Sequence, residues 1–236
     1  MGSTIGKCRI CGKEAKLTKE HIIPRSSIHK MNKVYYSDQL LKSLDNQPLR
    51  YNSFQNGYNK TTLCKKCNSK VGYLYDKSLI DFFDTLNRAM YKSIPKEPTL
   101  KESASERGIF MMKIQSFKPN NIARGLLAKF CSIVDFDMAE VIPDIAKILL
   151  GVRGYIENNY IFPTTISIGV EDGGDIRCFS GIELGHLGVY FVKNGNKGPE
   201  GTVDITDWFT YKYDQECSAE YNFPIIDSQM VKFPLK

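Results

Sequence analysis

The chain has 236 residues, of which 42% are hydrophobic and 25% are charged, and its formal net charge is +6. This composition excludes an intrinsically disordered protein, and the length allows one large or two small domains with a core. No stretch approaches the roughly 18 apolar residues of a membrane span, and the first residues lack the apolar region of a signal peptide. We therefore expect a cytoplasmic protein whose seven cysteines are reduced thiols or metal ligands.

The positive charge is concentrated in the first third of the chain. Residues 1–75 contain 14 Lys and Arg against 4 Asp and Glu, a net charge of +10, whereas residues 76–236 carry −4. Such a basic segment favours contact with a polyanion such as nucleic acid, although a solvated basic face would give the same count.

Two Cys-x₂-Cys pairs bound most of this basic region: Cys8 with Cys11, and Cys64 with Cys67. Two residues between thiolates let both sulfurs reach one ion, and two such pairs complete a tetrahedral zinc site with no open position. A redox pair would instead need a thioredoxin-like βαβ setting, which residues 1–75 do not offer. We predict a structural Zn²⁺ held by all four cysteines. The other cysteines stand singly among apolar residues, which is typical of buried thiols: Cys131, Cys178 and Cys217.

The two cysteine pairs are separated by 52 residues, whereas a simple zinc ribbon needs about 15–20. The segment KEHIIPRSS, residues 19–27, lies within this long separation. A zinc ion at its base would hold a short hairpin rigid without a large hydrophobic core.

The order CxxC, EHIIP and Asn-x₄-CxxC-Asn resembles the HNH endonucleases, the ββα-metal family with flanking zinc knuckles. The matched segments are CRIC, KEHIIPRSS and NKTTLCKKCNSKVG, which lie within residues 8–72. The resemblance implies that His21 is the general base that activates water and that Asn59 orients it. It also implies that Glu20 and Asn68 bind a catalytic divalent ion, Mg²⁺ or Mn²⁺.

The chemistry of these residue types agrees with hydrolysis of a phosphodiester. Imidazole supplies a base with a pKa near neutrality, and carboxylate and amide oxygens are hard ligands suited to Mg²⁺ or Mn²⁺. Glu20 and His21 are adjacent, so on a strand they would point to opposite faces. Both can serve one site only if the ion sits at a bend or at the edge of a strand. The candidate phosphate contacts nearby are Arg25, Lys65, Lys66 and Lys70.

The segment between His21 and Asn59 has 37 residues, which is long for a compact member of this family. It interleaves aromatic residues such as Tyr35 and Tyr51 with basic ones such as Lys33. Aromatic rings could stack on bases while the basic groups follow phosphates, or the rings could pack onto the small core. Both interpretations stay open at this level.

Beyond the second cysteine pair, periodicity predicts the remaining elements. Apolar spacing favours an amphipathic helix within residues 73–93, and a segment rich in Pro, Ser and charge at 93–107 indicates a linker. A strand is expected at 108–117 and a helix at 121–136, with Asn120 or Asn121 as its N-cap. Further expected elements are a helix over 139–151, kinked or started at Pro143, and strands at 164–170, 175–184, 187–193 and 202–213.

The predicted fold class is therefore α+β: a zinc-stabilised ββα-metal module over residues 1–92, a linker, and a C-terminal domain over 108–236 with a mainly antiparallel sheet. The predicted function is a metal-dependent endonuclease, with DNA favoured over RNA as substrate. The alternative is a zinc-stabilised nucleic-acid-binding module without catalysis. A third option is a nuclease that is silent until a partner releases it. The C-terminal domain is a candidate surface for a protein partner or for self-association.

Overall fold

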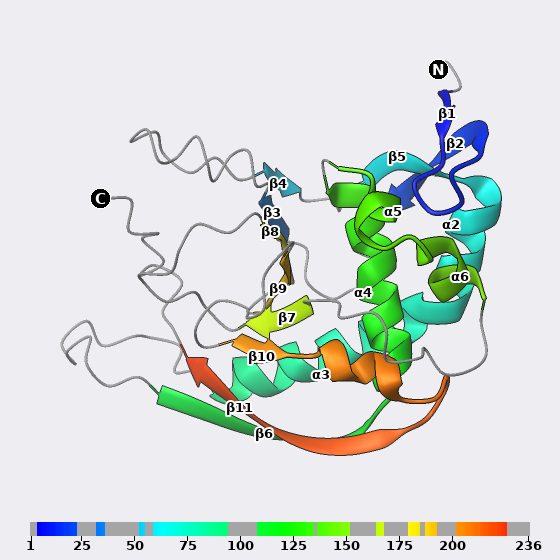
Figure 1. Ribbon diagram of the computed structural model, residues 1–236. Coiled ribbons are helices and arrows are strands. Elements are labelled where there is room, and N and C mark those ends of the chain that lie inside the picture. The colour runs from blue at the N-terminus through cyan, green and yellow to red at the C-terminus, as the bar shows by residue number, and fades with distance from the viewer. Residues whose placement is uncertain are drawn as a thin grey trace.

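The computed structural model describes residues 4–22, 32–35, 52–54, 59–93, 108–134, 136–151, 164–167, 179–184, 187–192 and 202–225. The fold is α+β, and every strand pair described is antiparallel. Helix α4 (Pro119–Ile133) runs through the middle of the molecule, with a small sheet near one end and a two-stranded ribbon near the other (Figure 1). A six-stranded sheet lies beside this helical body.

The small sheet is built from the N-terminal region. Its order is β1 (Ile5–Lys7), β2 (Glu14–His21) and β5 (Asn59–Cys64). A β-bulge interrupts the pairing of β2 with β5 between Thr18 and Lys19. A continuous helical stretch follows β5, formed by α2 (Lys65–Val71), the π-helical turn η1 (Gly72–Asp76) and α3 (Lys77–Ser93).

Helix α4 is buried along its whole length. It approaches η1 closely, since a Cβ atom added to Gly125 would lie 3.1 Å from the Cβ of Tyr75. The expected helix is confirmed, but the expected N-cap is wrong: Lys118 precedes the first turn, where Pro119 suits the helix start. The side chains of Asn120 and Asn121 instead point into the protein and donate to Phe209 O and Asp214 Oδ1 at 3.1 and 2.9 Å.

Two short helices follow α4 where one helix, kinked or started at Pro143, was expected. They are α5 (Met138–Val141) and α6 (Ile145–Leu150), separated at Pro143, and Gly151 follows the second helix as predicted. Tyr75 donates its hydroxyl proton to Leu149 O at 2.8 Å, which ties η1 to the end of α6.

The two-stranded ribbon pairs β6 (Gly108–Phe117) with β11 (Cys217–Ile225). The prediction for β6 is confirmed, whereas β11 was not predicted. The expected strand at 202–213 is only partly correct: it holds β10 (Thr202–Asp204) and then the 3₁₀ helix η2 (Thr206–Thr210). Trp208 of η2 packs edge-on against Phe82 of α3, with ring centroids 5.4 Å apart.

The six-stranded sheet combines segments from both ends of the chain. Its order is β10, β7 (Thr164–Ser167), β9 (Leu187–Val192), β8 (Phe179–Leu184), β3 (Asn32–Tyr35) and β4 (Asn52–Phe54). Val34 of β3 pairs with Ile182 of β8, so the segment between the cysteine pairs extends a sheet made by the C-terminal half. The predicted division at residues 93–107 stays a prediction. Along the described ranges, none of the helices has the length and apolar character needed to cross a membrane.

Candidate metal centre and hairpin site

The first cysteine pair lies in a tight turn between β1 and β2. Gly12 N donates to Cys8 O at 2.8 Å, and Cys8 N donates to Lys13 O at 2.9 Å. Gly12 has a positive φ of 69°, which a residue with a side chain would adopt at a cost. The turn is also bonded to β5, because Arg9 N donates to Thr62 O at 3.1 Å.

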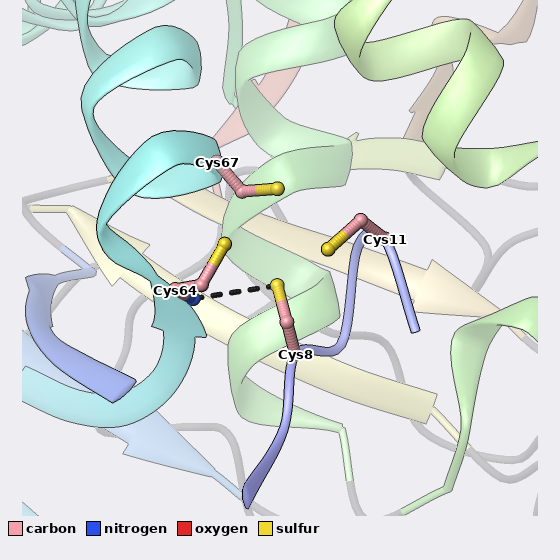
Figure 2. Close-up of side chains that lie close together, drawn as sticks. All are labelled: Cys8, Cys11, Cys64 and Cys67. Atoms are coloured by element: carbon pink, nitrogen blue, oxygen red, sulfur yellow. Dashed lines mark hydrogen bonds between the residues drawn. The ribbon is translucent and has the colours of Figure 1, made fainter. Parts of the chain in front are cut away.

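The second pair lies where β5 passes into α2, with Cys64 as the last residue of the strand and Cys67 in the first turn of the helix. Figure 2 shows the four sulfur atoms directed toward one another. All four lie within 4.8 Å of one another. The prediction that the two pairs converge is therefore confirmed, and the cluster could hold one metal ion such as zinc.

Charge explains why this cluster suits a cation. Burial alone would raise the pKa of Cys8, but backbone N–H groups, including that of Cys64 at 3.3 Å from its sulfur, bring its pKa below the usual value. Burial and the neighbouring thiols raise the pKa of Cys67. One cysteine of the cluster is therefore readily deprotonated, whereas its thiolate opposes deprotonation of the others. A bound dication would offset this repulsion between thiolates.

The hairpin of β2 and β5 brings His21 and Asn59 together as a directly opposed cross-strand pair. His21 is the last residue of β2 and is half-buried, and Asn59 is the first residue of β5 and is exposed. Side chains of opposed residues share one face of a sheet. The two residues to which the resemblance gives base catalysis therefore lie side by side.

Asn68 fastens the helix to the hairpin. Its side-chain nitrogen donates to Thr18 Oγ1 and to Lys19 O, both at 3.0 Å. Thr18 in turn donates to Leu63 O at 3.0 Å on the opposite strand. The Asn68 side chain thus links α2 to β2 by hydrogen bonds next to the bulge.

Glu20 points away from the His21 face, as the alternation of a strand requires. Its side chain is 1% exposed, and its Oε1 lies 3.3 Å from Lys129 Nζ. Its other carboxylate oxygen accepts a hydrogen bond from the Ser132 hydroxyl. Both oxygens therefore have partners on α4, and the carboxylate lies on the other face from His21. This arrangement does not fit the role of ligand to a catalytic ion.

Lys129 is the centre of this polar group. Its side chain is 4% exposed, and its ammonium also lies 2.9 Å from Asp76 Oδ1 and 3.2 Å from His21 O. Burial raises the pKa of Glu20. Burial would lower the pKa of Lys129, but the carboxylates of Glu20 and Asp76 outweigh it and raise the pKa of this lysine, which stays charged at neutral pH.

The predicted phosphate contacts lie on the helical stretch after β5. Lys65 and Lys66 are exposed and Lys70 is partly exposed, whereas Arg25 lies outside the described residues. Tyr73, which is 88% exposed, continues this face one turn beyond Lys70. The sequence carries a signal for this face, since Lys70 follows Lys66 by four residues and Tyr73 follows Lys70 by three.

Sequence reasoning also missed the contacts that join the hairpin to α4. The Arg9 guanidinium donates to the last carbonyls of α4, including Cys131 O and Ser132 O, both at 3.4 Å. Beyond the end of α4, Lys7 donates to Asp137, the N-cap of α5, at 2.9 Å. The sequence did carry one signal, since Lys129 interrupts an otherwise apolar run. Cys131 is buried as expected and Cys217 is half-buried, while Cys178 lies outside the described residues.

Comparison with known proteins gives no relative for this chain: no family model matches it, and neither a curated protein nor a solved structure shows significant similarity.

Proposed function

We propose that the chain is an endonuclease of the HNH type that hydrolyses phosphodiester bonds in nucleic acid, with DNA as the favoured substrate. The observation that carries the proposal is the opposed pair His21 and Asn59 at the open end of a hairpin whose other end is closed by four cysteines. Two antiparallel strands followed by a helix, with Asn68 bonded back to the first strand, have the order that the resemblance implies.

In this proposal His21 takes a proton from water through its Nε2 atom, because its Nδ1 atom is buried, and the resulting hydroxide attacks the phosphorus atom. The P–O bond to the sugar oxygen then breaks, and the leaving oxygen takes a proton from solvent water. Asn59, opposite His21, holds the imidazole in one orientation. Lys19 is exposed and lies two residues before His21 on the same face of β2, so it is the nearest cationic side chain in sequence that could meet the phosphate. A zinc ion held by the four cysteines would be structural, because four sulfur ligands leave no open position.

The competing function is nucleic-acid binding without catalysis. The observation that favours it is the Glu20 carboxylate, which is committed to Lys129 and Ser132 and so does not face the histidine. The lysines of α2 and the exposed Tyr73 would serve a binding protein equally well.

The deciding experiment compares the wild type with His21→Ala on supercoiled plasmid, single-stranded DNA and structured RNA, in Mg²⁺, in Mn²⁺ and in EDTA. Loss of the base should lower cleavage by about 10²–10⁴-fold and leave affinity for the substrate nearly unchanged. Equal loss of binding and cleavage would contradict the role of His21. Salt-sensitive binding with no cleavage by either protein would favour the binding module.

The nucleic-acid surface is tested separately by affinity. Tyr73→Ala should weaken binding to single strands by about 1–3 kcal/mol, because base stacking is lost, whereas Tyr73→Phe should bind nearly as the wild type does. Lys66→Gln should weaken binding to all sequences and reduce the slope of log affinity against log salt by about 1. Both are measured by fluorescence anisotropy at several salt concentrations. Unchanged affinity in Tyr73→Ala and Lys66→Gln would place the contact surface elsewhere.

A further inference from the structure

The Glu20 carboxylate is the acidic group that the HNH resemblance gives to a divalent ion, yet in this fold it already has a cation. Lys129 Nζ lies 3.3 Å from Glu20 Oε1, and both side chains are almost fully buried. Ser132, one turn further along α4, donates to the other carboxylate oxygen. A divalent ion could reach this carboxylate only by displacing the ammonium from a buried position.

The ammonium of Lys129 has three protons to donate, and three acceptor atoms surround it. They are Glu20 Oε1 at 3.3 Å, Asp76 Oδ1 at 2.9 Å and the main-chain oxygen of His21 at 3.2 Å. These acceptors come from β2 and from the π-helical turn η1. One side chain of α4 therefore fixes the last residue of β2 and the turn after α2 at the same time.

We propose that Lys129 is a positioning residue for His21, and that its ammonium holds Glu20 in place of a divalent ion. This inference rests on the proposed function, since it assigns the support of the same histidine. By binding the carbonyl of His21 and the side chain of the preceding residue, Lys129 sets the direction in which the imidazole leaves the strand. Glu20 is then a docking group for α4, on the side of the hairpin opposite to substrate.

The first test is Glu20→Gln, which keeps the size and the hydrogen-bonding oxygen but removes the charge. If Glu20 docks onto α4, cleavage below the melting temperature should stay within about tenfold of the wild type, since the base remains in place. Binding of Mn²⁺, measured by calorimetry, should be unchanged. Loss of Mn²⁺ binding together with a loss of cleavage of about 10²-fold or more would overturn the proposal and restore Glu20 as a ligand.

The second test is a cycle with Lys129→Met. The single variant leaves Glu20 buried without its cation and should lower the melting temperature by about 10 °C, whereas Glu20→Gln/Lys129→Met should recover part of this loss. Additive changes in the cycle would argue against a direct pairing.

A purely structural role for Lys129 would change only the amount of folded protein. A positioning role predicts a further effect in folded Lys129→Met: the pH midpoint of cleavage should rise. The reason is that His21 loses a neighbouring cation, while the nearby carboxylate of Asp76, which is partly exposed, remains. An unmoved midpoint in the folded variant would contradict the positioning role. If the wild type cleaves nothing, the nuclease proposal fails by itself. The melting temperatures of the double-mutant cycle and the Mn²⁺ titration still decide whether Lys129 or an ion holds Glu20.

Discussion

The cysteine-bound hairpin and the helical body around α4 differ in what stabilises them. The hairpin, residues 4–22 and 59–64, buries few large apolar side chains, among them Ile10, Ile22 and Leu63, and it is closed by four thiols. The helical body buries apolar residues along α3, α4 and α6 and adds an aromatic cluster around Trp208. The hairpin therefore has little packing of its own beside the cysteine cluster, which could hold a metal ion, and its polar contacts to α4, whereas the body depends on packing.

The largest effect is expected where the metal is lost. Cys64→Ser, or removal of zinc by a chelator, should unfold the hairpin, because binding of the ion and folding of its site are one equilibrium. The chain has a single tryptophan, Trp208, which packs in the helical body, so its fluorescence should change little. Hydrogen exchange of peptides from residues 4–22 should become fast.

Cys217→Ser is the matched control, because Cys217 lies on β11 outside the cluster. This variant should keep one zinc ion per chain. A soluble Cys64→Ser protein with full zinc content and a protected hairpin would contradict the structural-zinc assignment.

A loss of packing should act on the body instead. Phe130 of α4 is fully buried, and Phe130→Ala should reduce the free energy of unfolding by about 3–5 kcal/mol, since a large apolar side chain leaves a cavity. Urea denaturation followed at Trp208 measures the loss. Lys113→Ala on the exposed side of β6 is the control and should change stability by less than about 0.5 kcal/mol. A similarly small loss in Phe130→Ala would mean that this helix is not the centre of the core.

The smallest effect is expected at the join between the two regions, where Lys7 meets Asp137. The hydrogen bond from Lys7 and the N–H of Ala139 hold the pKa of Asp137 below its usual 3.8. Its contribution to stability is therefore present above that value and is lost as the pH falls through the lower pKa of the folded state. Asp137→Ala also removes the N-cap of α5 and should cost about 1 kcal/mol near pH 7.

Asp137→Asn separates these two contributions, because an amide oxygen can still cap the helix. Its stability difference from the wild type should vanish as acid protonates Asp137. Chemical denaturation at several pH values checks this, and a difference that persists below pH 2 or so would exclude the ionisation of Asp137 as its cause.

The sequence allowed accurate prediction where one local pattern dominates. The cysteine spacing predicted the cluster, and the apolar segment Gly108–Phe117 predicted β6. Prediction failed where distant residues decide. Asn120 and Asn121 look like helix caps, but their partners are 89 and 93 residues away. Glu20 and Lys129 are 109 residues apart, so the sequence around Glu20 does not show that a lysine of α4 pairs with its carboxylate.

The pairing of β3 with β8 has a consequence for the order in which the chain is made. The four cysteines are all present once residue 67 has been synthesised, so the metal site can close early. Strand β3 must wait for its neighbour, because Val34 pairs with Ile182. Until β8 emerges from the ribosome, the edge of β3 that later pairs with β8 is open, and it is a template for pairing with another chain. Fragments that end before residue 179 should therefore bind zinc and yet aggregate, whereas the full chain should stay soluble.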